Sequence, residues 1–160
     1  MRWLWIDKFT EFIPRKSACA VKCVTAAEEH LHDLYPDFPI VPHTLIIEGM
    51  AQTAGILVGE ASSFSQKVIL AKIGKATFHR LVRPGDTMVF SARIDQFSEQ
   101  GASTRGDVKI GDELVAEIEL MFSHIDQNLA GMEFPEHNFV FTDQFRQVLD
   151  THRMGASIRL

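Results

Sequence analysis

The chain has 160 residues, of which 46% are hydrophobic and 23% charged, and its formal net charge is −5 at pH 7. This length and composition are typical of one soluble domain with a substantial core. The acidic balance argues against a general nucleic-acid-binding protein. The N-terminus M-R-W-L-W-I-D-K lacks the apolar core of a signal peptide, and no segment reads as a membrane span. We therefore expect a cytoplasmic protein without a membrane partner.

The first regular element is a strand over residues 17–25, where side chains alternate and two cysteines, Cys19 and Cys23, occur. Four residues of strand separate their Cα atoms by about 13 Å, which is too far for a disulfide. The spacing predicts two free thiols on one face of the strand, acting as small core side chains in a reducing compartment.

Residues 26–41 lead to three prolines between residues 35 and 42, a pattern that predicts a stiff extended loop. The stretch 42–61, P-H-T-L-I-I-E-G-M-A-Q-T-A-G-I-L-V-G-E-A, then predicts a long helix that starts at Pro42. Its apolar residues point in every direction at the helical repeat, so the rest of the domain must enclose it. Five small residues interrupt the apolar run.

Glu48 is the anomaly of this helix, because a carboxylate on an enclosed helix must be paired, protonated or functional. The structural interpretation is a hydrogen bond with Gln52, one turn further along the same face. The functional interpretation is a carboxyl that exchanges a proton with a substrate. The residues around Glu48, described below, favour the second.

After the helix the chain predicts consecutive antiparallel strands. Residues 68–80 read as one or two strands, the R-P-G-D segment as a turn, and residues 87–98 and 103–110 as further strands. Gly111-Asp112 is a plausible hairpin turn. Residues 113–124 alternate cleanly, with apolar residues on one face and Glu117 and Glu119 on the other, as in a sheet with one wet side.

Together these elements predict the α+β class, with an antiparallel sheet wrapped around one long central helix over residues 1–125. Residues 126–160 form a C-terminal extension with a short helix. Thr142 would cap that helix, and one face carries Phe145, Val148, Leu149 and His152. We expect this face to pack on the sheet or on a partner subunit.

The segment P-D-F-P-I-V-P-H-T-L-I-I-E-G-M-A-Q (residues 36–52) closely resembles the motif of 3-hydroxyacyl-acyl-carrier-protein dehydratases of the FabZ/FabA type, H-F-P-G-x-P-V-M-P-G-V-L-x-x-E-A-M-A-Q. The likeness extends over about residues 3–124. It implies the hotdog fold, a homodimer or trimer of dimers, and elimination of water from a 3-hydroxyacyl thioester to give a trans-2-enoyl thioester. The substrate would be carried by acyl carrier protein or CoA in fatty-acid or lipid biosynthesis, with no metal or cofactor.

The resemblance also implies roles for particular residues. Glu48 matches the general acid that protonates the departing hydroxyl. The family's basic His falls on Leu34, and the Gly whose N–H holds the thioester oxygen falls on His43. We therefore expect His43 to act as N–H donor and candidate replacement base, with His32 as another candidate. The predicted substrate-binding residues are Leu34, Pro42, His43, Gln52 and Phe78.

Leu34 leaves two alternatives open: a non-catalytic acyl-thioester-binding or partner subunit, and a hotdog thioesterase. His30 and His32 would share a face if extended, but no third ligand suggests a metal site. Residues 67–83 contain five basic residues, Lys67 among them, and no acid. The resemblance implies carrier-protein docking by Lys72, Lys75, Arg80 and Arg83, and the alternative is a solvated strand edge guarded by charge.

Overall fold

The computed structural model describes residues 3–128, 131, 135 and 140–157. Within them the helices and strands, in chain order, are β1 (Lys8–Ile13), β2 (Ser17–Cys23), α1 (Glu29–Asp33), α2 (His43–Ala61), β3 (Val68–Phe78), β4 (Thr87–Phe97), β5 (Gly101–Ile110), β6 (Glu113–His124), α3 (Ile125–Asn128) and α4 (Asp143–Ser157).

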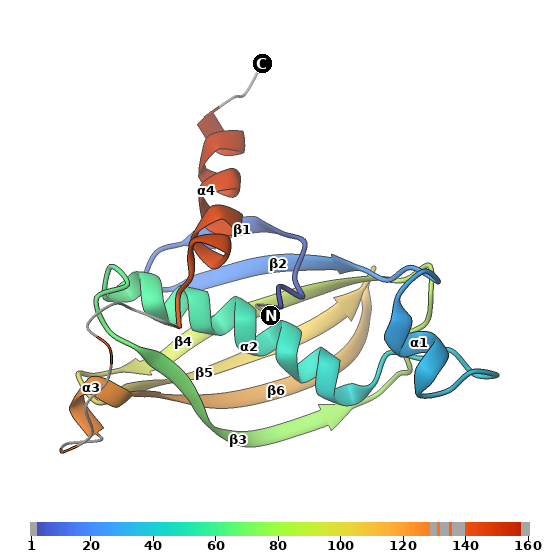
Figure 1. The fold of residues 1–160 in the computed structure, drawn as a ribbon, viewed down its shortest axis with the longest axis horizontal. Coiled ribbons are helices and arrows are strands. Elements are labelled where there is room, and N and C mark those ends of the chain that lie inside the picture. The colour runs from blue at the N-terminus through green and yellow to red at the C-terminus, as the bar shows by residue number, and fades with distance from the viewer. Residues whose placement is uncertain (1–2, 129–130, 132–134, 136–139, 158–160) are drawn as a thin grey trace.

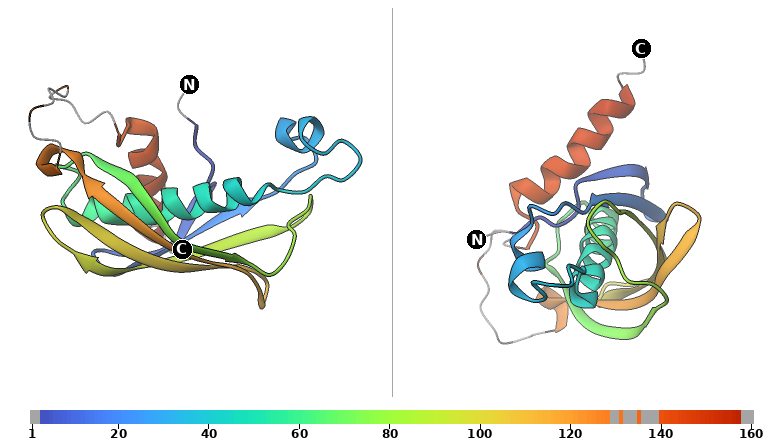
Figure 2. Two further views of the ribbon diagram at one scale, coloured as in Figure 1. Left: turned by 90° about the horizontal axis from the view of Figure 1, so that it is seen from below. Right: turned by 90° about the vertical axis from the view of Figure 1, so that its right-hand side faces the viewer.

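All six strands form one sheet in the order β1-β2-β4-β5-β6-β3, and every neighbouring pair is antiparallel. The long helix α2 lies across one face of the sheet (Figure 1), and the end-on view shows the strands curving around it (Figure 2). The predicted α+β arrangement, an antiparallel sheet wrapped around one central helix, is therefore confirmed. No helix in the described ranges is long and apolar enough to cross a membrane.

The alternation of β6 explains why this strand covers the helix. Ile118 and Leu120 are buried, while Glu117 and Glu119 between and beside them are exposed, as predicted. β4 repeats the pattern with Phe90 and Ala92 turned inward. Each strand thus presents an apolar row to α2 and a polar row to water.

Small residues let the rest of the molecule approach α2 closely. A Cβ at Gly49 would lie 2.3 Å from the ring of Phe90, and one at Gly59 would lie 2.3 Å from the ring of Phe141. Two aromatic rings therefore occupy space that a larger helix residue would need. The same helix buries Ile46, Met50, Ile56, Leu57 and Val58 on its several sides.

Two local expectations need correction. Residues 29–33 form the short helix α1 rather than an extended loop, because they precede the first proline and bury Leu31 against the core. His30 and His32 therefore do not share a strand face. Residues 8–13 form the edge strand β1, and residues 68–78 form one continuous strand, which agrees with the expectation of one or two strands there.

The C-terminal helix α4 packs on β1 and then projects beyond the body of the molecule (Figure 2). Val148 and Leu149 are buried, and His152 Nδ1 lies 3.0 Å from the Phe9 carbonyl oxygen. The predicted apolar face is therefore used against the sheet. The predicted side-chain cap is wrong: the Thr142 carbonyl accepts the Arg146 N–H, but the buried Thr142 hydroxyl has no hydrogen-bond partner among the described residues.

Candidate functional site

Glu48 is half buried on α2 and is held by its neighbour one turn along. Gln52 Nε2 donates to Glu48 Oε1 at 2.8 Å. Pairs four residues apart meet on one face of a helix, so the local contact follows directly from the sequence. No hydrogen bond between described residues engages Glu48 Oε2, which leaves that oxygen available to a bound molecule.

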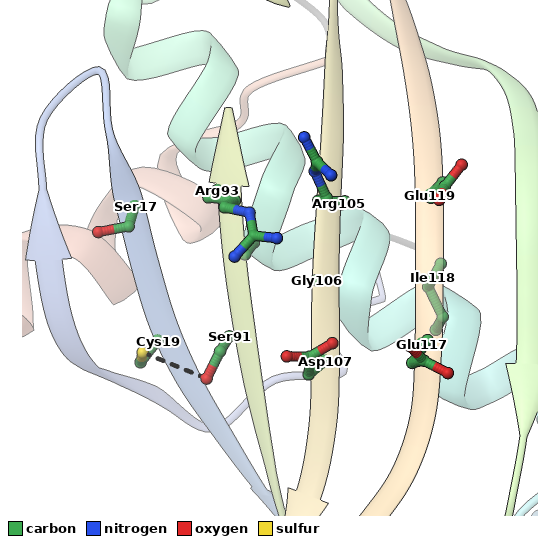
Figure 3. A pocket seen from close by; sticks show the side chains of 11 residues that line it. Ser17, Cys19, Ser91, Arg93, Arg105, Gly106, Asp107, Glu117, Ile118 and Glu119 are labelled. Atoms are coloured by element: carbon green, nitrogen blue, oxygen red, sulfur yellow. Dashed lines mark hydrogen bonds between the residues drawn. The ribbon is translucent and has the colours of Figure 1, made fainter. Parts of the chain in front are cut away.

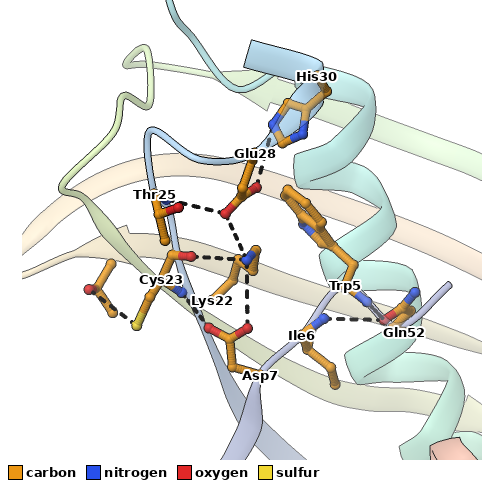
Figure 4. A network of polar contacts seen from close by, with 10 residues as sticks. Trp5, Ile6, Asp7, Lys22, Cys23, Thr25, Glu28, His30 and Gln52 are labelled. Carbon is orange, nitrogen blue, oxygen red and sulfur yellow. Dashed lines mark hydrogen bonds and ion pairs between the residues drawn. The ribbon is translucent and has the colours of Figure 1, made fainter. Parts of the chain in front are cut away.

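Gln52 is itself fixed by the N-terminal segment of the chain. Its Oε1 accepts the backbone N–H groups of Trp5 at 2.9 Å and Ile6 at 3.3 Å (Figure 4). Its Nε2 also donates to the Trp3 carbonyl at 3.1 Å. These partners determine which end of the amide is nitrogen. A buried amide with its donors and acceptor used is rigid, so Gln52 sets the position of the Glu48 carboxylate.

The Glu48 side chain lines an apolar pocket of about 170 Å³ between α2, β3, β6 and the C-terminal extension. Glu48 and Gln52 supply its polar groups, and the other lining residues are Ala51, Gly55, Ile56, Val68, Leu70, Phe122, Val140, Phe141 and Phe145. A mostly apolar pocket with a few placed polar groups is the usual form of a small-molecule site. The sequence did not indicate that Val140, Phe141 and Phe145 would line it.

His43 is the first residue of α2, directly after Pro42, and its exposed ring stacks on Phe78. The two ring centroids lie 4.0 Å apart and the planes differ by 2°. Two of the predicted substrate-binding residues therefore meet. The first N–H groups of a helix have no partner within it and form the positive end of its dipole. The backbone N–H of His43 therefore suits an oxygen that gains negative charge.

The structure does not bring His43 to Glu48 within one chain. Five residues along a helix correspond to a rotation of about 140° around its axis. The imidazole lies against Phe78 on β3, whereas the carboxylate lies against Gln52 and the pocket. The two side chains therefore diverge along α2 within one chain.

Leu34 follows α1 and exposes 56% of its surface, with Tyr35 and Phe38 beside it at 48% each. The guanidinium carbon of Arg83 lies 4.9 Å from the centre of the Phe38 ring. His32 points elsewhere, with Nε2 2.6 Å from the Ala26 carbonyl oxygen. This loop therefore presents apolar side chains to solvent at the end of the molecule where α2 begins.

His30 belongs to a polar cluster beside Trp5 (Figure 4). Its ring packs edge-on against Trp5, with centroids 5.3 Å apart, and its Nε2 lies 3.7 Å from Glu28 Oε2. Burial lowers the pKa of His30, and this outweighs the opposing effect of the Glu28 charge. The nearby ammonium of Lys22, which is 3.0 Å from Glu28 Oε1, also lowers that pKa.

The basic residues of the segment 67–83 do not form one patch. Lys67 is buried and pairs with Asp126 at 2.7 Å, so its inclusion in a basic face was wrong. Arg80 pairs with Asp86 and Glu113 at 3.1 and 3.3 Å. Arg83 lies at the Phe38 loop, whereas Lys72 lies six residues before the end of β3, about 20 Å along the strand. Only Arg83 thus adjoins the exposed apolar loop.

The outer face of the sheet carries a second, polar hollow (Figure 3). Arg105 Nε lies 2.6 Å from Asp95 Oδ2, and Cys19 Sγ lies 3.5 Å from Ser91 Oγ. The two cysteines are free, as predicted, but the prediction that they are core side chains is wrong. Cys19 is half buried and Cys23 exposed because β2 turns both toward this wet face.

A curved antiparallel sheet around one long helix, with a carboxylate on that helix beside an apolar pocket, defines a hotdog-fold protein. Solved structures with the same architecture include the dehydratase heterocomplex ApeI:P from Xenorhabdus doucetiae, with a TM-score of 0.65, 14% identity, and coverage of 79% of this chain and 90% of that one. Another is smu.793 from Streptococcus mutans bound to acetyl CoA, with a TM-score of 0.60, 11% identity, and coverage of 77% and 91%.

Sequence comparison identifies the family to which the chain belongs. The FabA-like domain family matches residues 2–119. A 3-hydroxyacyl-[acyl-carrier-protein] dehydratase FabZ from Thermoanaerobacter sp. (strain X514) is 39% identical over 121 residues, which cover 75% of this chain and 85% of that relative. The chain therefore belongs to the FabA-like family.

Proposed function

We propose that this protein is a dehydratase of fatty-acid or lipid biosynthesis that removes water from a 3-hydroxyacyl thioester to give a trans-2-enoyl thioester. The observation that carries the proposal is Glu48. It occupies the position of the family's acid, in a chain that matches the family over residues 2–119, and Gln52 holds it on the wall of an apolar pocket. The FabZ relatives carry the same activity in their names.

In this reaction a base removes the proton from C2, and the C–H electron pair forms the new double bond. The C3–O bond breaks as the Glu48 carboxyl donates its proton, so hydroxide leaves as water. This step requires the protonated form of the carboxyl. The N–H of His43 at the start of α2 would stabilise negative charge on the thioester oxygen.

The base is the second part of the proposal. Leu34 cannot accept a proton, and the imidazole of His43 is exposed with its ring nitrogens unused by hydrogen bonds between described residues. Stacking on Phe78 fixes the ring plane without occupying either nitrogen. Because His43 and Glu48 diverge within one chain, we propose that His43 of one copy works with Glu48 of a second copy in a homodimer.

A non-catalytic or partner subunit is the second candidate, and the exposed Leu34 favours it. In that role the pocket would bind the acyl chain, while another subunit would supply the missing base. The name of one structural neighbour records a dehydratase heterocomplex, so such an assembly has a precedent in this fold.

Product analysis with 3-hydroxybutyryl and crotonyl thioesters separates the candidates. We expect the wild type to interconvert the two thioesters. The turnover rate should fall by about 10²–10⁴-fold in Glu48→Gln. It should not fall in Glu60→Gln, which makes the same change on the same helix outside the pocket. Free thiol would identify a thioesterase. Activity absent from the wild type but present in Leu34→His combined with His43→Gly would identify a binding subunit derived from an enzyme.

The same assay identifies the donor of the acyl group. We propose acyl carrier protein, docking through Arg83 beside the exposed Phe38 loop. Arg83→Glu should raise KM for the carrier-bound substrate and leave KM for a pantetheine thioester unchanged, whereas Arg93→Glu on the outer face should change neither. Equal KM values for carrier-bound and CoA substrates in all variants would contradict this partner.

A further inference from the structure

We infer that the C-terminal extension ends the acyl-binding pocket, and that Phe145 together with Phe141 restricts the protein to short acyl chains. The inference rests on the proposed function, because it takes the apolar pocket at Glu48 as the place of the acyl chain. It assigns a specificity role to residues beyond 119, where the match to the FabA-like family stops.

The first argument is the composition of the pocket along α2. Its polar groups, Glu48 and Gln52, belong to the N-terminal half of the helix, and its apolar lining on α2 continues to Gly55 and Ile56, one turn beyond Gln52. A thioester with its reacting carbons at Glu48 would therefore extend its hydrocarbon tail toward the C-terminal half of α2. Val68, Leu70 and Phe122 give that tail an apolar wall on the strand side.

The second argument is that aromatic side chains close this path. Phe141 rests on Gly59, one helical turn beyond the lining residue Gly55, and approaches so closely that a Cβ there would meet the ring at 2.3 Å. Phe64 packs edge-on against it with ring centroids 5.1 Å apart. Phe141 is 5% exposed, so its ring is held in place by its neighbours. Phe145 lies four residues later, in α4. It lines the pocket and is only half buried.

The third argument is size. The pocket has a volume of about 170 Å³, below the range of about 300–1,000 Å³ typical of sites for drug-sized ligands. Short acyl groups fit such a space, and a longer chain that continued along α2 would meet the rings of Phe141 and Phe145, which line the pocket. Since close packing tolerates little extra volume, chain-length selection follows from where the extension places its rings.

Binding affinity across chain lengths tests this inference directly. Calorimetric titration with pantetheine thioesters of 3-hydroxybutyrate, 3-hydroxyoctanoate and 3-hydroxydodecanoate should show that the full-length wild type binds the shortest most tightly. Phe145→Ala should raise the ratio of dodecanoyl to butyryl affinity by about tenfold or more, the scale on which apolar pockets discriminate methylene groups. Phe145→Trp should lower the octanoyl affinity relative to butyryl.

Phe97→Ala is the matched control, because Phe97 is partly exposed on β4 and does not line this pocket. It should leave the chain-length profile unchanged, and circular dichroism should show all variants folded. A wild type that binds long chains best, a profile unchanged in both Phe145 variants, or no binding at any length would overturn the inference. Turnover of the 3-hydroxybutyryl thioester in parallel reports on the proposed function separately, so either can fail alone.

Discussion

His30 shows how a single buried side chain ties stability to pH. Burial lowers its pKa below the ordinary value of 6.5, so the unfolded chain binds more protons than the folded protein as the pH falls through this range. The free energy of unfolding must then rise with pH there. The contribution of neutral His30 to the free energy of unfolding is complete above pH 6.5. It is lost as the pH falls below 6.5 toward the pKa of His30 in the folded state.

We therefore expect the urea midpoint of the wild type to fall between neutral pH and about pH 5, and to fall less in His30→Gln, whose side chain does not titrate. The groups that face His30 are Glu28, Lys22 and the ring of Trp5, and all remain in the variant. His32→Gln, the same substitution at an exposed position of the same short helix, is the matched control for the loss of a histidine side chain. An identical pH dependence of the urea midpoint in His30→Gln and the wild type would contradict the assignment of this dependence to His30.

At the scale of a single element, α2 packs most closely against its neighbours. The same Gly→Ala substitution is expected to change stability in opposite directions at two of its glycines. In Gly49→Ala the new Cβ would lie 2.3, 2.6 and 2.9 Å from three atoms of the fully buried Phe90 ring. In Gly55→Ala the nearest atom of Phe122 is 3.4 Å away. Overpacking of a core costs about 1–3 kcal/mol, while Ala gains about 1 kcal/mol over Gly within a helix.

Thermal unfolding should therefore show a lower Tm for Gly49→Ala, and an equal or higher Tm for Gly55→Ala. Both changes have the same intrinsic effect on the helix, so the difference between them isolates the contact with Phe90. A further change of Phe90→Leu should restore part of the Tm lost in Gly49→Ala. Equal Tm values for the two single variants would show that Phe90 moves aside at no cost.

Elements whose packing follows from their own sequence were predictable, and those that depend on distant partners were not. The alternation of β6 and the all-round apolar pattern of α2 identified their buried faces directly. By contrast, Phe141 and Phe145 line the pocket of Glu48 although more than 90 residues separate them from it along the chain. Lys67 was misplaced for the same reason, because its partner Asp126 lies in α3, directly after β6 and 59 residues along the chain.

The candidate site was predictable only where a motif fixed it. Glu48 and Gln52 share a helix face at a spacing of four, so their hydrogen bond could be expected. The anchoring of Gln52 by Trp3, Trp5 and Ile6 could not, because these residues precede it by 46 to 49 positions in the chain. The stacking of His43 on Phe78 likewise depends on how the end of β3 meets the start of α2.

At the scale of the whole molecule, the two edges of the sheet differ. β1 is covered in part by α4, whose His152 lies 3.0 Å from the Phe9 carbonyl. β3, at the other edge, exposes Ile69, Leu70 and Ile73 at 37, 39 and 45% of their surfaces. An exposed apolar edge strand is a template for pairing with another chain, and a two-fold axis would pair β3 with its own copy. This edge is our candidate for the homodimer interface.

Ile73→Lys should therefore shift the protein from dimer to monomer at micromolar concentration, because it places a charge on each side of the paired edge. Sedimentation velocity measures the change, and circular dichroism checks that the fold survives. Ile13→Lys is the matched control: Ile13 ends the opposite edge strand β1 and is 38% exposed. It should leave the dimer intact. Loss of turnover in Ile73→Lys but not in Ile13→Lys would then support a site built from two copies. A folded, active wild-type monomer would instead require acid and base from one chain, which the divergence of His43 and Glu48 on α2 opposes.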